Sequence, residues 1–261
     1  MNISLQNKTA VICGSTQGIG LAIAKEFAQS GASCILLARN EEAMQNMVQA
    51  LDTPLNQVHR YFIADFSNPT QVKKVIDAVI SLTPVHILVN NTGGPAAGPI
   101  TDATADAFLK AFQQHVINNQ LLAQAVIPSM KKEKYGRIIN IISTSVRIPI
   151  DNLGVSNTIR AAVASWAKTL SNEVGRYNIT VNSVLPGYTK TQRLDAVLEI
   201  NAASAGIDKL QYTKKMEEAI PMKRFGESYE IAAVVAFLAS PAASYINGVS
   251  IPVDGGRTGT I

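Results

Sequence analysis

A glycine-rich turn between a strand-like run and a helix-like run is the feature that most constrains this chain. The apolar residues 9–13 lead directly into Gly14-Ser15-Thr16-Gln17-Gly18-Ile19-Gly20, and an amphipathic helical pattern follows. Glycine lets the backbone approach a pyrophosphate closely, and the N-terminus of the helix supplies free N–H groups and a partial positive charge. Because strand, turn and helix occur in this order within a βαβ repeat, the motif predicts a dinucleotide-binding domain.

Short apolar runs and longer helical patterns alternate along the whole chain. The pattern predicts strands at residues 9–13, 34–38, 58–64, 86–89, 137–142, 179–185 and 249–253. It predicts helices at residues 19–30, 41–51, 69–82, 103–130, 155–176 and 228–239. Continuously apolar strands separated by amphipathic helices indicate a parallel sheet covered on both faces. We therefore predict one α/β domain over residues 1–261, a doubly wound Rossmann-type fold with seven parallel strands.

One segment departs from this alternation. Residues 189–222 are helical in character and lie between the sixth strand and the last helix. A connection of this length is usually functional, so we expect it to form a lid over the substrate site.

Composition excludes several classes of protein. The net charge is +4, but the basic residues are scattered, whereas a nucleic-acid surface gathers them on one face. The apolar run at residues 231–239 is about half of the length that a membrane span needs. Residues 1–8 are polar and unlike a signal peptide, and Cys13 and Cys34 read as buried, unpaired thiols. We expect a cytoplasmic protein with no nucleic-acid or membrane partner and no metal site.

The apolar content also bears on assembly. Apolar residues make up 47% of the chain, charged residues only 16%, and the mean hydropathy is +0.13. The helical patterns at 103–130 and 155–176 carry apolar residues beyond a single stripe, among them Trp166. We therefore expect a homotetramer in which these helices are covered by other copies.

The end of the second strand indicates which nucleotide the turn binds. An acidic residue there would bind the adenosine ribose of NAD, but the chain reads Ala38-Arg39-Asn40. Arg39 can form charge-assisted hydrogen bonds with a 2′-phosphate. The sequence therefore predicts that NADP (NADPH) is preferred over NAD.

Several motifs together resemble the short-chain dehydrogenase/reductase family, and its 3-oxoacyl-carrier-protein reductase-like branch in particular. The run from Cys13 to Gly20 is similar to the family's Thr-Gly-x-x-x-Gly-x-Gly, and residues 87–93, Ile-Leu-Val-Asn-Asn-Thr-Gly, are similar to its Asn-Asn-Ala-Gly segment. Residues 64–66 match the adenine-contacting strand end, residues 181–191 the nicotinamide-side loop, and residues 253–256 the C-terminal signature. The resemblance covers essentially all 261 residues. It implies a cofactor site made by Gly14, Ser15, Thr16, Gly18, Ile19, Gly20, Arg39, Asp65, Phe66, Asn90, Arg160, Pro186, Gly187 and Thr189.

The family's catalytic serine, Tyr-x-x-x-Lys motif and asparagine are only partly present. Ser143 holds the serine position. Thirteen residues later, Ser156 stands for the tyrosine and Arg160 for the lysine, and His115 takes the place of the asparagine. A shifted register does not restore the motif, because no tyrosine in the chain is followed four residues later by a lysine.

These replacements leave two functions open. Arg160 can still hold the nicotinamide ribose but cannot exchange a proton, so a proton would come from His115 or through water. Ser143 and Ser156 could together polarise a carbonyl. The first function is an NADP-dependent reductase of a small or acyl carbonyl substrate with an atypical site. The second is an NADP-binding protein with little or no turnover, acting as a sensor or an interaction partner.

Overall fold

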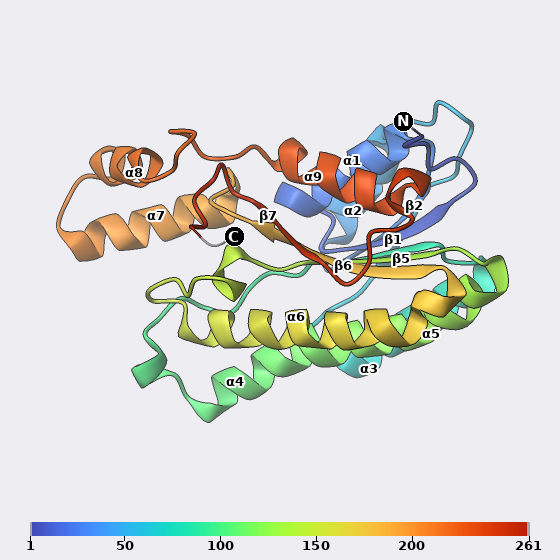
Figure 1. Cartoon of the computed structure of the whole chain (residues 1–261), viewed down its shortest axis with the longest axis horizontal. Coiled ribbons are helices and arrows are strands. Elements are labelled where there is room, and N and C mark those ends of the chain that lie inside the picture. The colour runs from blue at the N-terminus through green and yellow to red at the C-terminus, as the bar shows by residue number, and fades with distance from the viewer. Residues whose placement is uncertain (1, 260–261) are drawn as a thin grey trace.

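The computed structural model describes residues 2–259, which form one parallel sheet with helices on both faces (Figure 1). The seven strands lie in the order β3-β2-β1-β4-β5-β6-β7. Their bounds are β1 Thr9–Cys13, β2 Ser33–Ala38, β3 Arg60–Ile63, β4 Ile87–Asn90, β5 Gly136–Ile141, β6 Ile179–Pro186 and β7 Ser250–Val253. Every pairing is parallel, so all strands end at the same edge of the sheet.

The helices divide between the two faces. Their bounds are α1 Gly18–Gln29, α2 Glu41–Ala50, α3 Pro69–Leu82, α4 Ala105–Phe112, α5 Asn118–Glu133, α6 Gly154–Val174, α7 Gln192–Ala205, α8 Lys209–Glu218 and α9 Ser228–Ala239. In Figure 1, α1, α2 and α9 lie on one face and α3, α4, α5 and α6 on the other. The helices α7 and α8 extend beyond one end of the sheet.

Successive side chains along a strand point to opposite faces of the sheet, so a hydrophobic core forms on each face. In β1 and β2, Ile12 and Leu36 face the helices α1 and α9, whereas Val11 and Leu37 face the opposite layer. All four side chains are fully buried, as expected for central strands of a sheet covered on both faces. The predicted doubly wound fold and its seven strands are confirmed, with strand ends shifted by no more than two residues.

Strand order creates a crevice. The chain runs outward from β1 to β3 and then returns to β4, which pairs with the other side of β1. The segments that follow β1 and β4 therefore leave toward opposite faces, with α1 on one side and α4 on the other (Figure 1). In open α/β sheets, ligands bind in the crevice at this switch point.

The helix predicted over residues 103–130 is wrong as a single regular helix. Helix α4 begins after Thr104, whose side chain accepts a hydrogen bond from the Ala107 N–H. A π-helical turn, Gln113–Ile117, then separates α4 from α5. A π turn inserts an extra residue and shifts the faces of the helices on either side of it, which no hydrophobic period reveals. It places His115 and Asn118 in buried positions.

The segment between β6 and α9 forms a small unit with its own apolar cluster. Thr191 caps α7 by accepting a hydrogen bond from the Leu194 N–H, and Gly206, at a φ of 67°, ends that helix. The buried residues of the cluster are Leu194, Leu198, Ile220 and Phe225.

None of the helices within residues 2–259 is both long and apolar enough to cross a bilayer.

Candidate functional site

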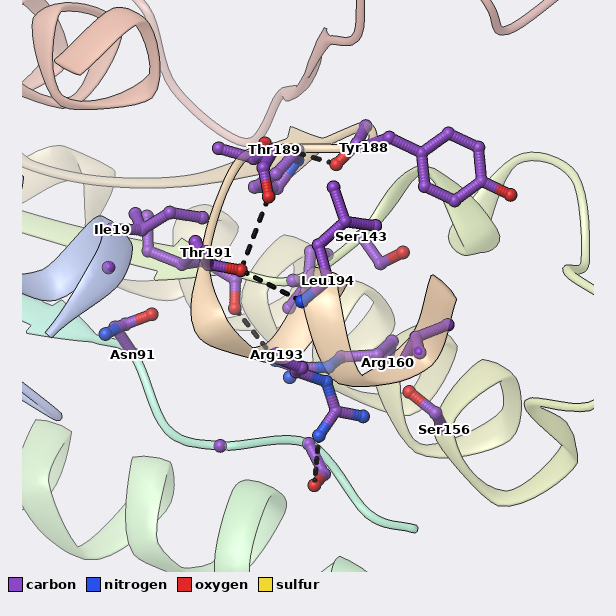
Figure 2. A pocket seen from close by; sticks show the side chains of 18 of the residues that line it. Ile19, Asn91, Ser143, Ser156, Arg160, Tyr188, Thr189, Thr191, Arg193 and Leu194 are labelled. Carbon is purple, nitrogen blue, oxygen red and sulfur yellow. Dashed lines mark hydrogen bonds between the residues drawn. The ribbon is translucent and has the colours of Figure 1, made fainter. Parts of the chain in front are cut away.

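A cavity of about 300 Å³ opens at the carboxyl ends of the central strands, against helix α7 (Figure 2). Its floor comes from the turn after β1, the segment after β4 and the ends of β5 and β6. Helix α6 and the start of α7 form its walls. Of the predicted site residues, it is lined by Gly14, Gly18, Ile19, Ser143, Ser156, Arg160, Pro186, Gly187 and Thr189.

The glycine turn is held in a shape that other residues would not tolerate. Gly14 and Gly18 have φ values of 59° and 54°, in the left-handed region. A side chain at Gly14 would meet the backbone oxygen of Asn91, and one at Gly18 would lie 3.1 Å from Thr191 Cγ2. The Asn91 side-chain amide donates to the Gly14 carbonyl at 3.0 Å and so ties the turn to the end of β4.

Ser15 indicates what this turn accommodates. Its hydroxyl is buried and has no hydrogen-bond partner among the described residues. A buried polar group without a partner is costly unless a ligand pairs with it. The N-terminus of α1 adds free backbone N–H groups beside it, so the residues here fit the pyrophosphate of a dinucleotide. Thr16 and Gly20 belong to the same turn and helix start.

Residues predicted to meet the adenosine end lie outside the cavity, at the neighbouring strand ends. Arg39 follows β2 and is exposed, and Asp65 follows β3, which pairs with β2. The Ser67 backbone N–H holds the pKa of Asp65 below its usual value, and the positive charge of Arg39 adds to this effect. Phe66 is buried in the core and presents its backbone oxygen to Asn118 at 2.7 Å. Asn90 is also buried, where its amide donates to Asn140 Oδ1 at 2.8 Å.

Ser143, Ser156 and Arg160 all line the cavity (Figure 2). Ser143 follows β5, and its Oγ accepts a hydrogen bond from the Ser145 N–H at 3.1 Å, which leaves the hydroxyl proton free to donate. Ser156 is buried in the first turn of α6, one helical turn before Arg160. The side chains of Ser156 and Arg160 therefore share one face of that helix.

The guanidinium of Arg160 is bound by backbone oxygens. Its Nη1 donates to the Ile141 carbonyl at 2.8 Å, and its Nη2 donates to the Thr92 carbonyl at 3.4 Å. Burial, and secondarily the nearby charge of Arg193, lower its pKa to about 10. Arg160 therefore remains a cation at neutral pH.

His115 does not line the cavity, and its surroundings disfavour the role of proton donor that the sequence left open for it. Its Nδ1 lies 2.9 Å from Thr92 Oγ1, and its Nε2 is buried without a partner among the described residues. Burial first, and then the charges of Arg160 and Arg193, lower its pKa to about 3. The imidazole is therefore neutral at pH 7 and is a poor source of a proton.

Among the cavity residues that sequence reasoning did not assign to the site are Arg193, Leu194 and Arg257. Arg193 and Leu194 belong to the first turn of α7, a segment predicted only as a lid without assigned contacts. Arg257 follows the C-terminal signature and stacks on the Tyr188 ring, with its Cζ 4.7 Å from the ring centroid. The position of Arg193 directly after the Thr189 and Thr191 motif was the one available signal.

Comparisons with known proteins identify the family of this chain. The family model described as Enoyl-(Acyl carrier protein) reductase matches residues 14–258. The uncharacterized oxidoreductase YvrD of Bacillus subtilis (strain 168) is 32% identical over 260 residues, which are 98% of each chain. Dehydrogenase/reductase SDR family member 4 of Sus scrofa is 33% identical over 253 residues, covering 97% of this chain and 88% of that protein.

Solved structures are similar over the same length. The crystal structure of L-sorbose reductase from Gluconobacter frateurii, complexed with NADPH and L-sorbose, matches with a TM-score of 0.93 and 31% identity, covering 100% of both chains. Sheet order, glycine turn and full-length similarity agree with one another. The chain belongs to the short-chain dehydrogenase/reductase family of oxidoreductases.

Proposed function

We propose that this protein is an NADP-dependent reductase of a carbonyl compound that works without a phenol–lysine pair. The observation that carries the proposal is that Ser143, Ser156 and Arg160 line the same cavity as Gly14 and Gly18 of the nucleotide turn. Two hydroxyls and a fixed cation thus lie beside the place where the nicotinamide end of a dinucleotide would extend from the turn. The solved relative from Gluconobacter frateurii binds NADPH and L-sorbose, which supports the same chemistry here.

Different residues would hold the adenosine end and the nicotinamide end of the cofactor. The backbone N–H groups of the glycine turn and the Ser15 hydroxyl bind the pyrophosphate, and Arg39 binds the 2′-phosphate. Pro186, Gly187 and Thr189 border the nicotinamide, and Arg160 donates to its ribose. When bound, the cofactor supplies the hydride that reduces the carbonyl carbon.

We propose that the protein's own residues stabilise the carbonyl oxygen of the substrate as it gains negative charge. The hydroxyls of Ser143 and Ser156 donate hydrogen bonds to the carbonyl oxygen, and these bonds strengthen as negative charge develops on it. Arg160 adds a positive field but gives up no proton, because it remains charged at neutral pH. His115 is neutral, so water entering the open cavity delivers the proton to the oxygen.

An NADPH oxidation assay against a panel of ketones, aldehydes and oxo acids tests the proposal. We expect turnover of at least one member of the panel. Ser143→Ala should lower that rate by roughly 10²–10³, the usual loss for one oxyanion donor. Thr169→Ala is a matched control, because Thr169 is an exposed hydroxyl on the same helix as Ser156 but outside the cavity. Equal rates for Ser143→Ala and the parent would contradict the assigned role.

A non-catalytic function remains the second candidate. It is favoured by the lining of the cavity, which among the described residues includes no histidine, cysteine, lysine, aspartate or glutamate. In that case the protein binds NADPH with the same residues but oxidises none of it. Calorimetric titration showing tight NADPH binding, together with no turnover on the full panel, would support this candidate.

A further inference from the structure

The lining of this cavity carries positive charge that no carboxylate among the described residues balances. Three arginines line it, Arg160, Arg193 and Arg257, whereas no aspartate or glutamate does so among the described residues. None of the three is within 4.0 Å of a carboxylate in the part of the chain that the structure describes. Like charges gathered in a cleft without compensation raise the free energy of the empty site and favour an anionic ligand.

Arg193 and Arg160 come close to each other from different elements. Arg193, in the first turn of α7, donates from Nη1 to the Gly94 carbonyl at 3.0 Å and from Nη2 to the Pro95 carbonyl at 2.9 Å. A methyl group added to Gly94 would lie 2.9 Å from Arg193 Nη2 and 3.3 Å from Arg160 Nη2. Two guanidinium groups are thus held near one backbone position by carbonyl oxygens alone.

The anion that these groups suit is not the pyrophosphate of the cofactor. The pyrophosphate has its own site at the glycine turn, where Ser15 and the backbone N–H groups of α1 lie. Figure 2 shows Arg193 directed away from Ile19 of that turn and toward the chain that follows Asn91, on the side of Arg160 and Ser156. Arg193 therefore belongs to the half of the cavity that would receive the substrate.

The other lining residues and the size of the cavity indicate which kind of anion would bind. Apolar residues also line the cavity, namely Ile142, Ile150, Leu153, Leu194 and Val197. The cavity of about 300 Å³ must also admit the nicotinamide, which favours a short ligand beside it. A planar guanidinium pairs best with a carboxylate, through two parallel N–H···O bonds.

We propose that the substrate is a short oxo acid whose carboxylate binds Arg193, with its carbonyl at Ser143 and its hydrocarbon part against the apolar lining. Arg160 and Arg257 contribute positive field. The inference rests on the proposed function, because it names the substrate class for that same site. It requires only binding and no turnover, so the two can fail separately.

Binding of matched acids and neutral esters tests it. The probes are the 2-oxo, 4-oxo and 5-oxo isomers of octanoate and their methyl esters, titrated calorimetrically into the protein with saturating NADP⁺, which cannot reduce them. We expect at least one acid to bind about tenfold or more tightly than its ester, as for one charge-assisted hydrogen bond. Equal affinities of every acid and its ester would overturn the proposal, whether or not the protein reduces carbonyls.

Substitutions of Arg193 then test where the carboxylate of the bound acid lies. Arg193→Gln should remove the preference for the acid, Arg193→Lys should keep part of it, and NADP⁺ affinity should change little in both. Arg60→Gln is the matched control, because Arg60 is exposed at the start of β3, at the opposite edge of the sheet. An Arg193→Gln protein that keeps the acid preference overturns the proposal. So does one that loses NADP⁺ and acid affinity equally, since Arg193 would then serve the cofactor. Circular dichroism of each variant shows that it is folded.

Discussion

Arg39 is the residue to which we assign the proposed preference for NADPH. It follows β2, is exposed, and forms no ion pair within 4.0 Å among the described residues, so its guanidinium is available to a 2′-phosphate. Asp65 lies near enough for the charge of Arg39 to lower its pKa, and this aspartate partly offsets the positive field. The proposed preference for NADPH would therefore come from a direct contact at this position rather than from the net charge of the region.

Arg39→Ala should remove most of that preference. We expect NADPH affinity to fall by about 1–3 kcal/mol, the value of a charge-assisted contact, while NADH affinity changes little. Calorimetric titration of parent and variant with both nucleotides measures the effect. Equal affinities for NADPH and NADH in the parent would contradict the assignment.

Individual residues were predictable from the sequence where a motif fixed their place along the backbone. The glycines of the turn and the serine after β5 lie where the motifs indicated because strand ends and helix starts determine them. Arg193 was not predictable in the same way. Its position in the cavity depends on how α7 folds back over Gly94, and on backbone carbonyls far away in sequence.

At the scale of elements, the π turn between α4 and α5 controls the state of His115. Burial there, and then the charges of Arg160 and Arg193, lower the pKa of the imidazole to about 3, far below the usual value for histidine. The strands could be predicted because continuous apolar runs report burial directly. The π turn could not, because it leaves the apolar pattern unchanged and alters only where side chains point.

His115→Asn should therefore leave the pH dependence of the reductase rate unchanged near neutrality. The stability of the fold should respond instead. Because the folded pKa lies below the unfolded one, the unfolded chain binds the proton first, and this contribution to stability is lost as pH falls from about 6.5 toward 3. The free energy of unfolding should thus change less between pH 7 and pH 4 in the variant than in the parent.

Urea unfolding at several pH values measures this difference. The pKa values of His59 and His86 are also lowered by burial, and both residues stay in the variant, so some pH dependence remains in each protein. An unchanged slope in His115→Asn, or a rate profile flattened near pH 7, would show that His115 titrates normally.

At the scale of the whole molecule, exposed apolar side chains mark two surfaces. One lies along α4 and the π turn, where Leu109 and Phe112 are 64% and 42% exposed. The other lies near β7, where Tyr245 is fully exposed and Val249 is 38% exposed. Trp166 is instead partly buried within the chain, and its Nε1 donates to Gln120 at 2.7 Å. The expected role of Trp166 in assembly is thus weakened, but the exposed residues still favour association.

A homotetramer with two-fold axes remains our prediction. Two separate apolar surfaces on each chain allow two kinds of two-fold contact, and the two together close a tetramer. Light scattering at micromolar concentration should give four times the mass of 27.9 kDa. A stable monomer under those conditions would be incompatible with the prediction.

We propose that this cavity supports reduction without the Tyr-x-x-x-Lys pair, whose two positions are held by Ser156 and Arg160. The most direct test compares NADPH oxidation by the parent and by the double variant Ser156→Tyr plus Arg160→Lys, on one panel of carbonyl compounds. We predict turnover by the parent that the double variant does not exceed, because hydroxyls and water already supply what the site needs. A parent that oxidises no NADPH on any substrate, beside a double variant that acquires reductase activity, would contradict the claim.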